Sequence, residues 1–308
     1  MYQPLCPART AFVPLRHHRY HVRSWGEPRA GTPPLVLLHG WMDVGASWQF
    51  VVDALAVRGG DGRQTLAPDW RGFGLTEGPP TDHYWFPDYL ADLDALLDQL
   101  APGQQVDLAG HSMGGNVAML YAGARPGRIR RLVNLEGFGL PATEPGQAPA
   151  RHAEWMDELK QAAGGGLGMA TYADAEGVAR RLMKNNPRLP LDKALWLAQH
   201  WARPVAQADG RVRWQILADP AHKTIGAQLY RADEACAHFS SITAATLVLE
   251  ADGAPLARWD GRYTLDDWHK RLRKVRDCRI ATVAEAGHML HHDQPARVAQ
   301  LIGDFLDA

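Results

Sequence analysis

The chain has 308 residues, of which 46% are hydrophobic and 22% are charged, so it is long enough to bury a sizeable core. Its 33 basic and 34 acidic residues nearly cancel, which argues against a general affinity for nucleic acid or for an anionic membrane surface. Three widely spaced cysteines, Cys6, Cys236 and Cys278, offer neither a disulfide framework nor the spacing of a metal site.

Targeting and membrane signals are missing from the printed sequence. Residues 1–9 lack a basic start followed by an apolar stretch, and no apolar run approaches the length of a membrane span. We therefore expect a cytoplasmic location and no membrane insertion. The sequence makes no prediction about homo-oligomers.

The predicted elements begin with two short strands, residues 12–15 and 19–25, which should form a hairpin. Residues 34–38 are a continuous apolar run, as in a strand buried on both faces of a parallel sheet. Helical periodicity with one apolar face covers residues 87–100 and 295–306. Further strands are predicted, in chain order, at residues 64–68, 105–109, 131–135, 245–249 and 279–283.

Strand alternating with helix predicts an α/β protein with a mostly parallel central sheet flanked by helices. The alternation stops near Gly139, and the chain from there to about Ala237 has mostly helical patterns. We therefore expect a core made of residues 1–138 and 238–308, with residues 139–237 inserted as a helical cap. Such an insertion would cover the carboxyl ends of the strands, where ligands bind in these sheets.

A serine between glycines marks the first candidate for chemistry. Residues 110–115 read Gly-His-Ser-Met-Gly-Gly and follow a predicted strand directly. Glycines at positions 110 and 114 permit a very sharp strand-to-helix turn that exposes the Ser112 hydroxyl. The same turn aims the free amides of the helix N-terminus at any anion forming beside it. Ser112 is the predicted nucleophile.

Serine is a weak nucleophile and needs a base, which we predict to be His288. His288 follows the strand at residues 279–283 and precedes the final helix, so it should lie on a loop at the same edge of the sheet. We interpret the neighbouring His291 and His292 as exposed loop or helix-entry residues. A metal role for this histidine-rich loop stays open, but the spacing of its histidines and carboxylates matches no metal motif that we recognise, so neither a metal nor a cofactor is predicted.

Backbone amides are the expected donors to a developing oxyanion. One is the amide of Met113, directly after the serine. The other should be the amide of Trp41, in the loop after the strand at residues 34–38. Gly40 gives that loop the freedom to turn its amides inward.

Two carboxylates at strand ends could orient the base. Glu136 follows the strand at residues 131–135, and Asp252 follows the strand at residues 245–249. Each also has a structural interpretation, Glu136 as a buried residue bonded to loop backbone and Asp252 as a turn residue before a glycine. Asp69 and Arg71, after another strand, are predicted to hold a glycine-bent loop by charge-assisted hydrogen bonds.

Four segments taken together resemble the α/β-hydrolase superfamily. They are Leu-His-Gly-Trp-Met-Asp at 38–43, Asp-Trp-Arg-Gly-Phe-Gly at 69–74, the serine motif at 110–115 and Gly-His at 287–288. The His-Gly-Trp-Met-Asp segment looks closest to the serine hydrolase-like branch. The resemblance covers nearly the whole chain and implies the α/β-hydrolase fold with a cap. It also implies Ser112 as nucleophile, His288 as base, and the amides of Trp41 and Met113 as the oxyanion hole.

The chain departs from the family pattern at the acid. Members usually carry Gly-x-x-Asp after the strand equivalent to residues 245–249, but here Ala254 occupies about that position and Asp252 comes two residues early. Some haloalkane dehalogenases place the acid one strand sooner, which resembles the placement of Glu136. We therefore favour Glu136, with Asp252 as the alternative.

These residues predict a cofactor-independent, carboxylesterase-like serine hydrolase. Its partner would be a small, fairly apolar substrate, whose ester or related acyl bond would be cleaved through an acyl-enzyme. Hydrolysis of a carbon–carbon bond and acyl transfer use the same groups and stay open. A small-molecule receptor with slow or no turnover is the alternative from a different class.

Overall fold

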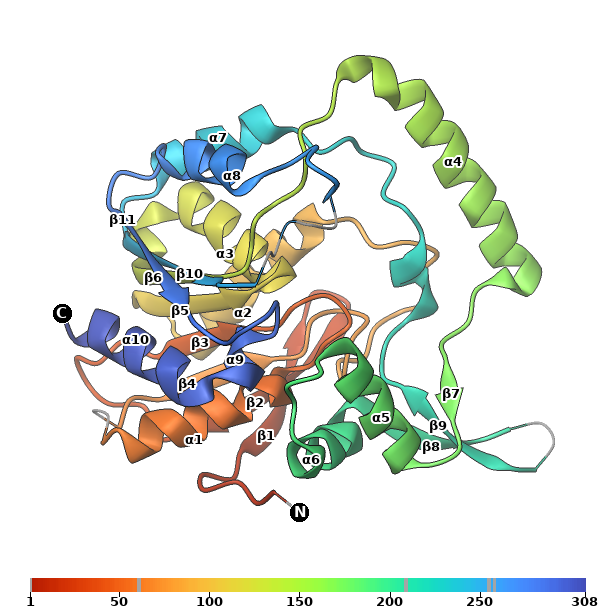
Figure 1. Ribbon diagram of the computed structural model, residues 1–308, viewed down its shortest axis with the longest axis horizontal. Helices are drawn as coiled ribbons and strands as arrows, with labels where there is room; N and C mark the ends of the chain where they lie inside the picture. The colour runs from red at the N-terminus through yellow and green to blue at the C-terminus, as the bar shows by residue number, and fades with distance from the viewer. Residues whose placement is uncertain (1, 60–61, 208–209, 254–255, 257–258) are drawn as a thin grey trace.

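The eight predicted strands all form, and they join into one sheet in the order β1-β2-β4-β3-β5-β6-β10-β11 (Figure 1). The computed structural model describes residues 2–59, 62–207, 210–253, 256 and 259–308. β1 and β2 form the predicted antiparallel hairpin, β2 is also antiparallel to β4, and the other pairs are parallel. The strands are β1 (Arg9–Leu15), β2 (His18–Trp25), β3 (Leu35–Leu38), β4 (Thr65–Pro68), β5 (Val106–His111), β6 (Ile129–Leu135), β10 (Ala245–Ala251) and β11 (Cys278–Val283).

The sheet is covered on both faces because its apolar runs present alternate side chains to opposite sides. In β3, Leu35 and Leu37 pack in the cluster that contains α1 and α10, whereas Val36 and Leu38 pack in the cluster that contains α2, α3, α7 and α8. No helix in the described residues is both long and apolar enough to cross a bilayer. The flanking helices are α1 (Gln49–Val57), α2 (Pro87–Leu100), α3 (Met113–Ala124), α7 (Ala232–Ser241), α8 (Leu265–Leu272) and α10 (Pro295–Asp307).

Strand register brings the candidate residues to one edge of the sheet. Leu38 at the end of β3 pairs with Gly110 of β5, and His111 pairs with Leu135 at the end of β6. Leu135 in turn pairs with Leu249 of β10. The loops that follow these parallel strands therefore emerge side by side, which positions the serine motif next to the loops that carry Gly40 and Glu136.

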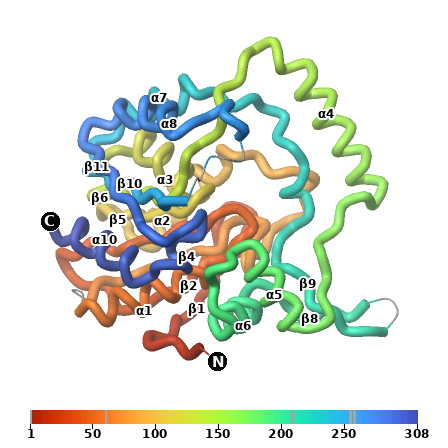
Figure 2. Tube along the Cα trace, in the orientation of Figure 1, coloured from red at the N-terminus to blue at the C-terminus, as the bar shows by residue number. Residues whose placement is uncertain are grey.

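The inserted segment, residues 139–231, leaves the core after β6 and returns at α7, as Figure 2 shows. It holds helices α4 (Ala148–Gln161), α5 (Ala175–Asn185) and α6 (Leu191–Trp201). It also contains an antiparallel sheet in the order β7-β9-β8, which the mostly helical interpretation missed. The strands are β7 (Thr171–Tyr172), β8 (Ala202–Ala206) and β9 (Val212–Ile216). They are short, and β8 contains a proline, so local periodicity did not reveal a pairing that forms between distant segments.

Helix α7 spans the predicted boundary between residues 237 and 238 and packs on α3 of the core. A Cβ at Gly123 would lie 2.3 Å from the carbonyl oxygen of His238, and the His238 Nδ1 lies 2.9 Å from the carbonyl oxygen of Leu120. Phe239 also belongs to the core cluster beneath α3. The exact domain limits stay a prediction, but α7 contributes to the core.

The loop after β4 is held by charge, as expected for Asp69 and Arg71. The Arg71 guanidinium donates two hydrogen bonds to Asp92 of α2, at 2.6 and 2.7 Å. Asp69 accepts the backbone N–H of Gly45 at 2.7 Å. A Cβ at Gly74, whose φ is +58°, would lie 2.2 Å from an Asp69 oxygen, so the bend requires glycine there.

Candidate active site

Ser112 lies on the sharp turn that the glycine pattern predicts, between β5 and α3. Its backbone has φ 52° and ψ −114°, outside the usual regions for a residue with a side chain. A Cβ at Gly110 would lie 2.3 Å from the carbonyl oxygen of Gly114, and one at Gly114 would lie 2.4 Å from that of Leu38. Both glycines are therefore required by close backbone contacts. The Ser112 amide donates to the carbonyl oxygen of Leu135 at 2.8 Å, which anchors the turn to β6.

His288 reaches Ser112 from the other end of the chain. Its Nε2 lies 3.0 Å from Ser112 Oγ, within proton-transfer distance. The loop that carries it is held by His111, whose Nε2 donates to the carbonyl oxygen of His288 at 2.7 Å. The His288 side chain is about a third exposed, so the imidazole is accessible from solvent.

The structure places Glu136 on the far side of the same imidazole. Its Oε2 lies 3.3 Å from His288 Nδ1, and its Oε1 accepts the amide of Ala251 at 2.7 Å. Glu136 has φ 56°, a strained conformation for a residue with a side chain, at the end of β6. Burial raises the pKa of this carboxyl, while the hydrogen bonds from His288 and Ala251 favour its ionised form.

Asp252 has a different role in the structure. Its carboxylate accepts the amides of Glu285 at 2.9 Å and of Ala286 at 3.2 Å, just before His288. These two backbone bonds lower the pKa of the Asp252 carboxyl. The side chain therefore braces the loop that leads to the imidazole. Ala254, at the position where family members carry the acid, lies outside the described residues.

The loop after β3 approaches the serine closely, as the oxyanion-hole prediction requires. A Cβ at Gly40 would lie 3.2 Å from Ser112 Cβ. Trp41 and Ser112 both line the same cavity. Met113 is the first residue of α3, where backbone amides have no acceptor within the helix. The assignment of these two amides to an oxyanion stays a prediction.

His291 and His292 are buried, so their interpretation as exposed residues was wrong. They lie in the short helix α9 (Leu290–Asp293) and are 0% and 3% exposed. The His291 ring packs on Trp48 with centroids 5.0 Å apart, and the His292 ring packs edge-on to Phe50 at 5.6 Å. Tertiary packing against the start of α1 causes this burial, which the loop-like sequence did not indicate.

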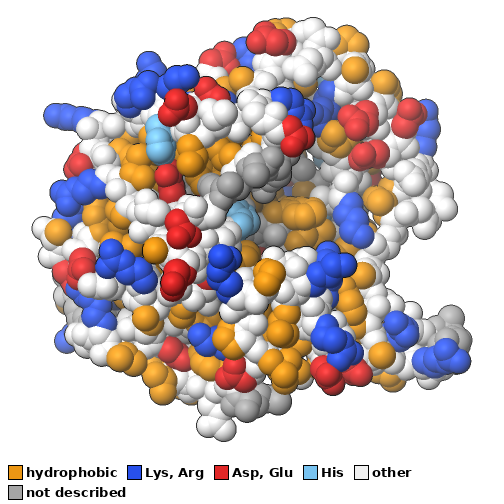
Figure 3. Space-filling view, in the orientation of Figure 1, with side chains coloured by type: hydrophobic (Ala, Val, Ile, Leu, Met, Phe, Trp, Pro, Cys, Tyr) orange, Lys and Arg blue, Asp and Glu red, His pale blue; other side chains and the backbone are white. Residues whose placement is uncertain are grey.

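A cavity of about 390 Å³ opens above Ser112 and His288. The space-filling view shows a hollow on this face with hydrophobic side chains along it (Figure 3). Core loops line one side through Gly40 and Trp41. A larger opening of about 500 Å³ has Leu75 and Arg203 in its lining. Within the part of the chain that the structure describes, Ser112, His288 and Glu136 do not line this larger opening. The inserted segment supplies most of the apolar lining of the smaller cavity. Its apolar lining residues include Met169, Ala170, Leu182, Leu189, Leu197, Trp201 and Ile216.

Polar residues of the inserted segment also reach this cavity, and sequence reasoning missed them. Arg181, Asn185 and Lys223 are exposed at it, and Asn186 is buried. Their position depends on how α5 and the segment before α7 fold over the core. A short-range motif carries no such information, so only the tertiary structure identifies them.

The model of the alpha/beta hydrolase fold family matches residues 33–295. Cis-3-alkyl-4-alkyloxetan-2-one decarboxylase of Shewanella oneidensis is 34% identical over 152 residues, which are 47% of this chain and 44% of that protein. The match therefore spans less than half of the decarboxylase.

Two further similarities extend over almost the whole chain. A serine hydrolase-like protein of Danio rerio is 28% identical over 92% of this chain and 86% of its own length. The solved structure of a thioesterase domain from the curacin biosynthetic pathway superposes with a TM-score of 0.80 and 25% identity. That superposition covers 96% of this chain and 99% of the domain.

Proposed function

The chain belongs to the α/β hydrolase fold family, and we propose that it is a cofactor-independent serine hydrolase. It would cleave an ester or related acyl bond of a small, fairly apolar substrate through an acyl-enzyme. The observation that carries the proposal is the continuous contact from Ser112 Oγ through the His288 imidazole to Glu136, at 3.0 and 3.3 Å. A nucleophile, a base and an orienting carboxylate in that order are the requirements for activating a hydroxyl.

Acylation follows from this geometry. The Ser112 Oγ attacks the substrate carbonyl carbon while His288 Nε2 takes the hydroxyl proton. The carbonyl oxygen gains negative charge, which the amides of Trp41 and Met113 would stabilise. The imidazolium then gives its proton to the leaving group as the bond to that group breaks. Glu136 stabilises the positive imidazolium and keeps Nδ1 protonated in the resting state.

Deacylation reverses the roles with water as the nucleophile. His288 Nε2 removes a proton from the water molecule, the hydroxide oxygen attacks the acyl carbon, and Ser112 leaves with the proton returned by the imidazole. The partial exposure of His288 supports access of water to this position. That access favours hydrolysis over transfer of the acyl group to another alcohol.

The cavity lining supports an apolar acyl or alcohol group. Leu182, Leu189 and Trp201 line the same cavity as Ser112 and offer aliphatic and aromatic surface to a substrate. The partial similarity to an enzyme acting on alkyl-substituted oxetan-2-ones, which are four-membered cyclic esters, supports adding lactones to the candidate substrates. The similarity to a thioesterase domain supports adding thioesters.

A fluorophosphonate probe tests the nucleophile directly. We expect the wild-type protein to be labelled covalently and the Ser112→Ala variant to lose labelling while keeping its unfolding temperature. Ser47→Ala is a matched control, because Ser47 lines the same cavity. A folded wild-type protein that does not react with the probe would favour the receptor function instead.

A panel of esters with graded acyl length, together with lactones and thioesters, tests the substrate class. Turnover that rises with acyl length and disappears in Ser112→Ala supports the proposed reaction. Turnover of a 1,3-diketone with no turnover of any ester would transfer the assignment to carbon–carbon bond hydrolysis.

A further inference from the structure

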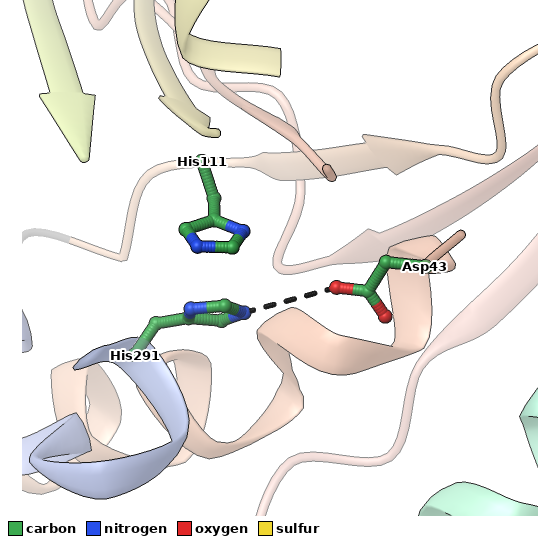
Figure 4. Close-up of side chains that lie close together, drawn as sticks. All are labelled: Asp43, His111 and His291. Carbon is green, nitrogen blue, oxygen red and sulfur yellow. Dashed lines mark ion pairs between the residues drawn. The ribbon is translucent and has the colours of Figure 1, made fainter. Parts of the chain in front are cut away.

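Three buried residues from distant parts of the chain meet at the active-site cavity, and two of them, Asp43 and His111, line it. Asp43 follows β3, His111 ends β5, and His291 lies in α9 (Figure 4). One nitrogen of each imidazole and one carboxylate oxygen all lie within 4.8 Å of one another. Figure 4 shows these atoms facing a common point, with His291 Nε2 4.0 Å from Asp43 Oδ2. This distance is too long for a direct hydrogen bond.

The facing atoms have no hydrogen-bond partner within the described part of the chain. Asp43 Oδ2, His111 Nδ1 and His291 Nε2 are all buried and unpaired. The three residues are 6%, 2% and 0% exposed. Buried polar atoms are nearly always paired, because an unpaired one costs about 1–3 kcal/mol. Three such atoms around one point therefore form one shared polar site, of the kind that an ordered water or a cation occupies in proteins.

In His111 and Asp43, the polar atom that does not face the common point already makes hydrogen bonds, as is typical of metal ligands. His111 donates its Nε2 proton to the carbonyl oxygen of His288 at 2.7 Å, which leaves a lone pair on Nδ1. Asp43 Oδ1 accepts the amide of Val44 at 2.9 Å and the hydroxyl of Ser47, which leaves Oδ2 free. Metal-bound histidines and carboxylates typically have such outer hydrogen bonds, which set the tautomer and orientation.

We propose that Asp43, His111 and His291 bind one divalent transition-metal ion of the zinc class. Two imidazole nitrogens and one carboxylate oxygen are a common set of three protein ligands for Zn²⁺, with a fourth position for water. Ligands at about 2.0–2.2 Å from the ion lie roughly 3.3–3.6 Å apart in a tetrahedron. The present 4.0 Å between His291 Nε2 and Asp43 Oδ2 therefore needs a contraction of about half an ångström, and a pair at the 4.8 Å limit of the cluster needs more than one ångström.

An ion can reach the cluster through the cavity. Asp43 and His111 line the cavity together with Ser112 and Ser47. The His111 and His291 rings pack with their centroids 4.3 Å apart. Two of the three proposed ligands are therefore reached directly from the cavity, and His291 lies against one of them.

Zinc binding to the full chain tests the site without any substrate. The chain is treated with a chelator, filtered, and titrated with Zn²⁺ by calorimetry, and bound zinc is counted by elemental analysis. We expect one equivalent in the wild type and a higher unfolding temperature when zinc is added. Mg²⁺ should not compete, because it prefers oxygen ligands. A wild type that binds no zinc overturns the proposal and leaves the proposed hydrolysis intact.

Variants distinguish this site from other histidines. We expect His291→Gln and Asp43→Asn each to weaken zinc binding by about 100-fold or more. Even the loss of a residue that only hydrogen-bonds to a metal ligand typically costs about 10-fold to 100-fold in affinity. His269→Gln is the matched control, because His269 also lies beside a carboxylate, with its Nε2 3.0 Å from Glu250. Equal loss in His269→Gln, or no loss in a folded His291→Gln, contradicts the assignment. If Asp43→Asn does not fold, His291→Gln alone decides.

Discussion

Replacing Glu136 with glutamine should reverse the tautomer of His288. Both carboxylate oxygens accept hydrogen bonds now, one from the amide of Ala251 at 2.7 Å and one from His288 Nδ1 at 3.3 Å. Glutamine has a single acceptor oxygen. Because an unpaired buried amide costs about 1–3 kcal/mol, that oxygen should stay on Ala251, and the NH₂ group should face Nδ1. The imidazole must then carry its proton on Nε2, where it cannot accept one from Ser112.

The magnitude follows from the same contacts. A serine triad with the wrong tautomer loses about 10⁴-fold in kcat. The 3.3 Å contact is longer than the roughly 2.7–2.9 Å of a strong charge-assisted bond, so His288 is held less tightly here. We therefore expect a loss of about 10³-fold in kcat, which is about 4 kcal/mol at 1.36 kcal/mol per tenfold.

The assay compares the wild type and Glu136→Gln on one activated ester, with kcat per active site counted by the fluorophosphonate probe. Thermal unfolding checks that the variant is folded. If kcat falls less than about tenfold in Glu136→Gln but by orders of magnitude in Asp252→Asn, the reasoning is refuted and Asp252 takes the role of the acid.

Three further predictions rest on separate contacts. Asp252→Asn should keep kcat within about tenfold, because this side chain accepts only backbone amides of the loop before His288; the same ester assay measures it. Gly114→Ala should lower the free energy of unfolding by about 1–3 kcal/mol in urea, because the added Cβ would lie 2.4 Å from a backbone oxygen. Gly127→Ala is the control and should be neutral, because a Cβ there would have nothing within 4 Å. Equal effects of the two substitutions would contradict the close contact at Gly114. The third prediction concerns pH. Burial raises the pKa of Glu136 in the folded state. Its contribution to the free energy of unfolding is therefore greatest below the ordinary glutamate pKa of about 4.3, and it is lost as the pH rises through the raised pKa of the folded protein. The free energy of unfolding of Glu136→Gln should therefore improve relative to the wild type between pH 4 and pH 7, and a difference that does not change with pH would contradict the raised pKa.

Much of the core could be read from the sequence because its signals are local. The buried run at residues 34–38 and the glycines around Ser112 act within a few residues of backbone, so periodicity and close contact reveal them directly. The family resemblance and the mostly parallel sheet were confirmed for the same reason. The position of His288 beside Ser112 could be predicted because His288 follows the last strand, and parallel strands bring their ends to one edge.

The remaining features depend on which distant segments pack together, and local patterns do not contain that information. Two strand ends each offered a carboxylate, but only the register of β6 beside β10 brings Glu136 to the imidazole and leaves Asp252 on the loop backbone. The small sheet of the inserted segment and the burial of His291 arise in the same way. A side chain's partners in space are set by the packing of whole elements, so only the tertiary structure decided them.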